Sequence, residues 1–215
     1  MTGLAQLERE ALCATLVDVG PDAPTLCSPW TTRDLAAHLV IRERRPDALP
    51  GVLMPALADH TQRVQDHYAA GDWPALVDLV REGPPGWNPT RVPAVDDAIN
   101  LGEFFVHHED VLRAAPGWTP EQARTLSEDT QKALWSRMRQ AGQLLFRRAP
   151  VGVVLHAAGH GRHSAKGPTK QGTVVIEGAP SELVLVAFGR GRVADVTYQG
   201  TDAAVEALKG AEFGV

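Results

Sequence analysis

The pattern of apolar residues changes at Pro150, and this change limits the folds that the 215-residue chain can adopt. Before Pro150, apolar residues recur at intervals of three and four in several long segments, which indicates amphipathic helices. After it, short valine-rich runs alternate with short helical segments, which is typical of a small α/β unit. The sequence therefore predicts an α+β protein, with a helical bundle at residues 1–149 and a small α/β module at 150–215.

The bundle is expected to contain four main helices. They are predicted at 3–19, 30–45, 94–114 and 119–148, with shorter helical segments at 52–70 and 72–81. Thr31 is the expected N-cap of the second helix, and Asp34 stands where a capping box requires an acid. In the module, strands are predicted at 151–156, 173–177 and 192–198, helices at 180–188 and 202–209, and a mobile loop at 157–168.

Composition excludes several classes of protein. A net charge of −5 argues against a nucleic-acid-binding role, because there is no surplus of basic residues to neutralise phosphates. No stretch approaches the roughly 18 uninterrupted apolar residues that a membrane span needs, and the N-terminus lacks the pattern of a signal peptide. We therefore expect a cytoplasmic protein. Cys13 and Cys27 are then expected to be free thiols, with a metal site built on both as the alternative.

The segment from Asn100 to Arg113 carries the polar residues that most need an explanation. Glu103, His107 and Asp110 follow one another at spacings of four and three, so they share one face of a helix that is otherwise rich in Phe, Val and Leu. A buried carboxylate and imidazole need partners. The partner is a divalent metal or, as the bland alternative, the three residues satisfy one another by hydrogen bonds. Periodicity does not decide between His107 and His108, and we choose His107 because it pairs with Glu103.

A metal held by Glu103 and His107 needs a third ligand from a facing helix, as in other bundles. His38 lies on the second helix, at the edge of its apolar stripe, and is the natural candidate. A satisfied core histidine is the alternative for this position. Two histidines and a glutamate would leave positions open on zinc or a similar ion, which is typical of a catalytic site.

Other side chains are candidates for supporting roles. Arg42, one turn beyond His38, could hold a substrate carboxylate, although a solvated surface arginine is the alternative. Arg113 is a second candidate for substrate binding. Asp110 is expected to orient His107 from behind. His160 and His163 form a His-x-x-His pattern in the glycine-rich loop, where solvent-exposed histidines are the expected outcome.

Two motifs resemble a known family. The segments Trp30-Thr-Thr-Arg-Asp-Leu-Ala-Ala-His38 and Glu103-Phe-Phe-Val-His107-His-Glu-Asp110 resemble the DinB-like bundle family, in particular its branch with the mycothiol-dependent maleylpyruvate isomerases. The segments Pro24–Cys27 and His38–Asp47 are more similar to an actinobacterial family of uncharacterised metal-binding proteins. The resemblance covers most of the chain. It implies a DinB-like four-helix bundle whose metal ligands are His38, Glu103 and His107, with zinc as the expected metal and nickel or another divalent ion as the alternative.

The resemblance also implies a chemistry. A low-molecular-weight thiol, mycothiol, would bind the metal as thiolate and add to an unsaturated or electrophilic small acid, as in an isomerase or S-transferase. The chain is somewhat short, and its loop Gly159-His-Gly-Arg-His-Ser164 does not map onto the isomerase, so no particular acid is assigned. Two alternatives remain: a metal- or ligand-binding protein without turnover, and a purely structural polar cluster. A homodimer also remains open.

Overall fold

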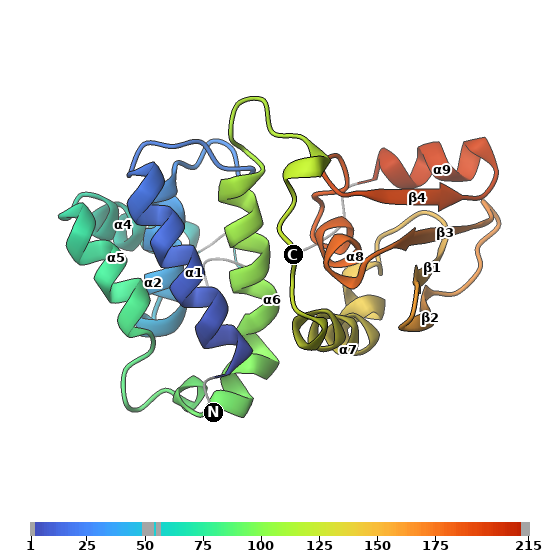
Figure 1. Cartoon of the computed structure of the whole chain (residues 1–215). Coiled ribbons are helices and arrows are strands. Elements are labelled where there is room, and N and C mark those ends of the chain that lie inside the picture. The colour runs from blue at the N-terminus through green and yellow to red at the C-terminus, as the bar shows by residue number, and fades with distance from the viewer. Residues whose placement is uncertain (1–2, 49–53, 55–56, 212–215) are drawn as a thin grey trace. The chain divides into compact units, whose positions relative to one another are not determined.

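The computed structural model describes residues 3–48, 54 and 57–211, and it divides the chain into two compact units (Figure 1). The first unit is Met1–Trp118 and the second is Thr119–Val215. The sequence places the boundary later, at residue 149. The difference concerns one helix, α7 (Glu128–Leu145), which packs against α8 and β2 in the second unit.

The described part of the first unit is built from α-helices. They are α1 (Leu4–Val19), α2 (Thr32–Arg44), α4 (Ala58–Ala69), α5 (Trp73–Glu82) and α6 (Pro93–Leu112). Helix α1 packs against α6 and α5, and α2 packs against α4 and α5. Together they enclose fully buried side chains, among them Leu12, Leu16, Leu35, Ile41, Phe104 and Phe105. The predicted start of the third helical segment, at residue 52, lies outside the described residues.

Local signals in the sequence position the helices that matter for the site. The Asp34 carboxylate accepts hydrogen bonds from the backbone N–H and the hydroxyl of Thr31, each at 2.9 Å, so the predicted capping box at the start of α2 is confirmed. Helix α6 begins at Pro93, whose missing N–H costs nothing in the first turn. The start of α2 and the course of α6 are therefore set by residues close to them in the sequence.

The second unit contains a mixed four-stranded sheet in the order β2-β1-β3-β4. The strands are β1 (Gly152–Ala157), β2 (Gly161–Lys166), β3 (Thr173–Gly178) and β4 (Val196–Gln199). β1 runs antiparallel to β2 and parallel to β3, and β4 runs antiparallel to β3. Helices α7 and α8 (Pro180–Ala187) pack together; α7 also contacts β2, and α8 and α9 (Asp202–Lys209) contact β3.

The mixed α+β character is confirmed, while two predicted elements are wrong. The helix expected at 119–148 is interrupted: a short 3-10 turn at Pro120–Gln122 is followed by extended chain, and α7 starts only after its own N-cap, Ser127. The mobile loop expected at 157–168 contains β2, which pairs with β1 through a glycine turn. β2 is mostly exposed, so it lacks the apolar alternation by which a strand is recognised in a sequence.

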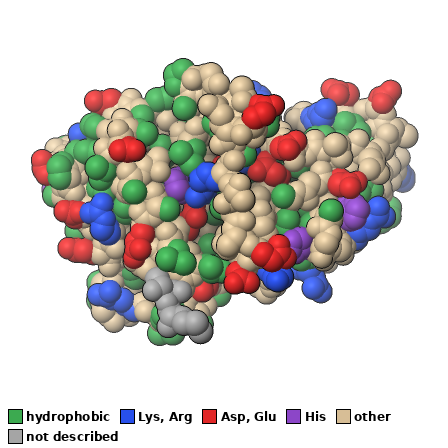
Figure 2. Space-filling model, viewed as in Figure 1, with side chains coloured by type: hydrophobic (Ala, Val, Ile, Leu, Met, Phe, Trp, Pro, Cys, Tyr) green, Lys and Arg blue, Asp and Glu red, His purple; other side chains and the backbone are tan. Residues whose placement is uncertain are grey.

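In the view of Figure 2, acidic and basic side chains are interspersed over each unit. None of the helices in residues 3–48, 54 and 57–211 combines the length and apolar character that crossing a bilayer requires.

Candidate metal centre

Helices α2 and α6 bring two of the predicted metal ligands, His38 and Glu103, each next to the third, His107. The rings of His38 and His107 lie 5.3 Å apart between centroids, with their planes at 72°. One turn before His107 on α6, Glu103 places its Oε2 3.8 Å from His107 Nε2. His107 is therefore the shared neighbour of an imidazole from α2 and a carboxylate from its own helix.

The orientation of His107 is set from behind by Asp110. Nδ1 of His107 lies 3.0 Å from Oδ2 of Asp110, whose side chain is fully buried. Because an ionised carboxylate only accepts hydrogen bonds, this contact assigns the ring proton to Nδ1 and leaves the lone pair of Nε2 on the side of Glu103. The same arrangement supports metal-binding histidines in other proteins. Asp110 thus lies where the sequence analysis expects an orienting residue.

His38 is held neutral. Burial lowers the pKa of His38 to about 3, and the neighbouring His107 and Arg42 contribute in the same direction. Two aromatic rings lie beside it: that of His107, and that of Trp30, whose ring centroid is 5.1 Å away. A neutral imidazole without a hydrogen-bond partner has a free lone pair, and metal coordination requires this form of histidine.

His38, Glu103 and His107 are residue types that bind divalent metals, but among the described residues the group whose ligand atoms all lie within 4.8 Å of one another is Cys27, His107 and Asp110. Two neutral imidazoles and a carboxylate are typical zinc ligands, and three protein ligands leave a coordination position open. The Glu103 side chain is 26% exposed, so the site is accessible from solvent. The alternative, hydrogen bonding among Glu103, His107 and Asp110, is realised in part: His107 is hydrogen-bonded to Asp110 at 3.0 Å, whereas Glu103 and His107, 3.8 Å apart, are too distant for a hydrogen bond.

The two candidate substrate-binding arginines differ in their surroundings. Arg42 lies at the site: its Nη2 is 3.6 Å from Glu103 Oε1, its Nη1 donates to Asn100 Oδ1 at 2.5 Å, and its side chain is 22% exposed. Arg113 is buried, donates to Glu109 at 2.5 Å and stacks over the ring of Trp118. Arg42 therefore remains the better candidate for contact with a substrate.

His108 points to a different partner from His107. Its Nδ1 lies 2.8 Å from Glu8 Oε1 and its Nε2 lies 2.8 Å from Thr15 Oγ1, both on α1. With both nitrogens engaged and only 3% of the residue exposed, His108 fastens α6 to α1. Periodicity alone could not separate these adjacent histidines.

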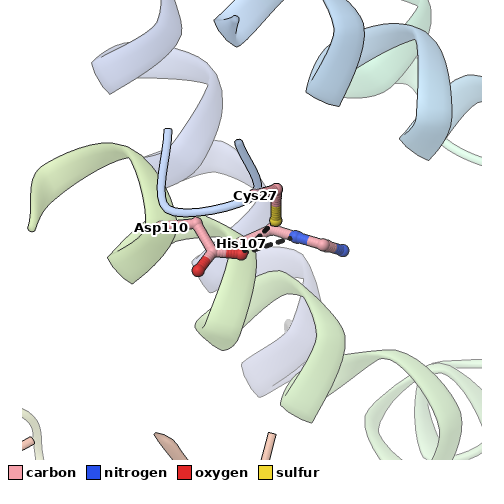
Figure 3. Close-up of side chains that lie close together, drawn as sticks. All are labelled: Cys27, His107 and Asp110. Atoms are coloured by element: carbon pink, nitrogen blue, oxygen red, sulfur yellow. Dashed lines mark hydrogen bonds and ion pairs between the residues drawn. The ribbon is translucent and has the colours of Figure 1, made fainter. Parts of the chain in front are cut away.

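Cys27, which the sequence predicts to be a free thiol, lies next to the candidate site. It lies on the segment between α1 and α2, which is tied to α6 by a hydrogen bond from Leu26 N to the Asp110 carbonyl. Its Sγ donates to Oδ2 of Asp110 at 3.0 Å, so Cys27, His107 and Asp110 meet at one carboxylate oxygen (Figure 3). Both cysteines are free, as predicted.

A buried ion pair supports Arg42 and was also not predicted. Arg9 is fully buried and donates two hydrogen bonds of 2.6 Å to the carboxylate of Glu43. Asn100 lies between this pair and Arg42, with its amide N–H groups directed at Asp96 and Glu43. The amide oxygen of Asn100 is thereby turned towards Arg42.

The two histidines of the predicted glycine-rich loop lie in the second unit, and the expectation that they are solvent-exposed is wrong, since the side chain of His160 is only 11% exposed. His163 lies on β2 opposite Leu155, and burial lowers its pKa. His160 lies 3.9 Å from Glu128. Within the described residues, neither belongs to a group of side chains arranged to hold a metal.

Comparisons with known proteins identify the fold. The structure is similar to the crystal structure of the mycothiol-dependent maleylpyruvate isomerase, with a TM-score of 0.58 and 20% sequence identity, over 91% of this chain and 90% of that chain. A variant of that enzyme with a histidine replaced by alanine gives the same TM-score at 18% identity, with the same coverage. No protein-family model matches the sequence, and the comparison with curated proteins found no match. The chain therefore has the fold of the mycothiol-dependent maleylpyruvate isomerase over 91% of its length.

Proposed function

We propose that the protein binds a divalent metal, zinc in the first instance, through His38, Glu103 and His107, and uses it to activate a low-molecular-weight thiol such as mycothiol. In this proposal the first unit is a variant of the DinB-like bundle, and the reaction is the isomerisation of, or S-transfer to, an unsaturated or electrophilic small acid. The observation that supports it is that His107 on α6 has both candidate partners beside it: the ring of His38 from α2, with centroids 5.3 Å apart, and Glu103, whose Oε2 is 3.8 Å from His107 Nε2.

Each residue of the site has a definite part in this chemistry. When bound, the metal would lower the pKa of a coordinated thiol and supply a thiolate at neutral pH. His38 offers a neutral nitrogen, and Asp110 orients His107 through the hydrogen bond at Nδ1, so that Nε2 faces the proposed metal. Trp30 packs on the ring of His38 and restricts its movement. Arg42 offers a cation at the exposed edge of the site for the carboxylate of the acid.

The proposal is tested in two stages with the full chain. Protein purified without added metal is expected to contain about one divalent ion per chain by elemental analysis, and its zinc form is expected to bind mycothiol. A panel of unsaturated and electrophilic acids is then followed for thiol-dependent consumption. Thiol binding without turnover of any acid in the panel would assign a ligand-binding role. A protein that contains no metal, and whose thermal stability does not change when divalent ions are added, would contradict the metal site.

The role of Arg42 can be tested separately. Arg42→Gln is expected to raise KM for the acid by roughly 10-fold to 150-fold, because a hydrogen-bonded charge pair with a carboxylate is worth about 1.5–3 kcal/mol. The metal content should not change. Arg45→Gln is the matched control on the same helical end, since Arg45 is paired with Asp47. An unchanged KM in Arg42→Gln would remove Arg42 from the substrate site.

A further inference from the structure

The cluster behind His107 contains three different kinds of metal ligand. The thiol of Cys27, Nδ1 of His107 and a carboxylate oxygen of Asp110 all lie within 4.8 Å of one another. In the structure two hydrogen bonds of 3.0 Å, from Sγ and from Nδ1, end on the same oxygen of Asp110 (Figure 3). A metal ion between these atoms would replace both bridging protons and satisfy the three groups at once.

We propose that Cys27, His107 and Asp110 form a second metal site, which takes a thiophilic divalent cation such as Cd²⁺ and cannot be filled together with the site at His38 and Glu103. The ligand set alone argues for the second site. Its exclusion of the first site rests on the proposed function, because both sites require His107.

The spacing of the three groups suits an ion the size of zinc, and the larger Cd²⁺ requires the contacts to lengthen somewhat further. Bonds of about 2.0–2.3 Å to nitrogen, oxygen and sulfur place tetrahedral ligand atoms roughly 3.3–3.7 Å apart. The two contacts of 3.0 Å need to lengthen by about half an ångström, which small side-chain rotations can supply. The ligand set of sulfur, nitrogen and oxygen is softer than the pair of imidazoles and a carboxylate, because only this set contains a thiolate.

The backbone around Cys27 already holds the thiol in place. Cys27 N donates to Thr25 Oγ1 at 3.2 Å, and Trp30 N donates to the Cys27 carbonyl at 3.0 Å. The residue is only partly buried, so an ion can reach the sulfur. Cys13 provides the contrast, since it is fully buried and burial raises the pKa of its thiol to about 11.

Exclusion follows from the two nitrogens of one ring. To bind at the second site, the Cys27 thiol releases one proton to solvent and its sulfur binds the metal. The proton on His107 Nδ1 must also leave that nitrogen, and in the neutral ring it moves to Nε2. A protonated Nε2 has no lone pair for the metal beside His38 and Glu103. The tautomer of His107 therefore decides which site can bind a metal: a proton on Nδ1 leaves Nε2 free for the site at His38 and Glu103, and a proton on Nε2 leaves Nδ1 free for the site at Cys27 and Asp110.

The test is a titration of the full chain with Cd²⁺, followed by the near-ultraviolet absorption of a thiolate–cadmium bond. We expect this band in the unmodified protein, its loss in Cys27→Ser together with a drop in Cd²⁺ affinity of more than about tenfold, and no change in Cys13→Ala. Serine keeps a hydrogen-bond donor for Asp110, and circular dichroism checks that each variant is folded. A band that persists in Cys27→Ser, or is absent from the unmodified protein, would overturn the second site.

Two further measurements separate this inference from the proposed function. His38→Ala should keep the cadmium band, because His38 is not a ligand of the second site, while its zinc binding is lost. If zinc binding survives in His38→Ala and is lost when Cys27→Ser is added, the zinc occupies the second site, and the proposed function is contradicted while the second site stands. Addition of Cd²⁺ to the zinc form should release zinc, with about one metal per chain throughout. Two metals bound together would refute the exclusion.

Discussion

Glu43→Gln is expected to lower the free energy of unfolding by about 3–5 kcal/mol, because it leaves the guanidinium of Arg9 buried without its counter-charge. Arg9 is fully buried and Glu43 is 5% exposed, so water cannot replace the lost partner. The remaining acid near Arg9, Asp96, is 3.7 Å away and already accepts a hydrogen bond from Asn100. Equilibrium unfolding in urea, followed by circular dichroism, measures the change.

The control for this variant is an exposed ion pair in the same unit. Arg44 and Glu82 are 3.0 Å apart, but the side chain of Glu82 is 66% exposed. Glu82→Gln should therefore change the unfolding free energy by less than about 1 kcal/mol. If the effect of Glu43→Gln were equally small, the ion pair would not hold the core of the first unit together. Glu43→Gln should also disturb the hydrogen bond between Asn100 and residue 43. Because the amide oxygen of Asn100 accepts from Arg42, the position of Arg42 would then be less well fixed.

His38→Ala is expected to weaken zinc binding by more than about 100-fold, which exceeds the 10-fold to 100-fold effect typical of residues that only orient a ligand. His38 has no hydrogen-bond partner among the described residues, so its removal should cost the metal-free protein little stability. Zinc at 100 times its Kd should stabilise the unmodified protein by about 2.7 kcal/mol. At the same zinc concentration, His38→Ala should gain almost nothing. Competition with a chromophoric chelator gives the affinity, and thermal unfolding with and without zinc gives the stabilisation.

The matched control is His67→Ala. His67 is exposed on α4, where its ring contacts Tyr68. Its removal should leave both the zinc affinity and the zinc-dependent stabilisation unchanged. Equal zinc binding by His38→Ala and the unmodified protein would show that α2 contributes no ligand and would contradict the proposed site, with the cluster of Cys27, His107 and Asp110 as the remaining place for the zinc.

Elements with strong local signals were predicted well from the sequence. The N-cap of α2, the proline at the start of α6 and the alternation of buried residues in β1 and β3 are local features, because they depend on neighbours a few positions away. The errors fall where tertiary packing overrides or replaces such signals. β2 is recognisable only through its pairing with β1, and α7 belongs to the second unit because its partners are α8 and β2.

By itself, the sequence determined the order of most helices and strands and the mixed α+β class. It also determined that Glu103, His107 and Asp110 share one face of α6, because helical periodicity sets which residues lie on the same face. Tertiary structure decided what each of these residues meets. It turns His108 towards α1 and His107 towards α2, and it brings Cys27 to Asp110 across 83 positions of the chain. It also buries Arg9 against Glu43. Contacts between residues far apart in the sequence depend on how whole helices pack, and that packing cannot be predicted from the local spacing of residues.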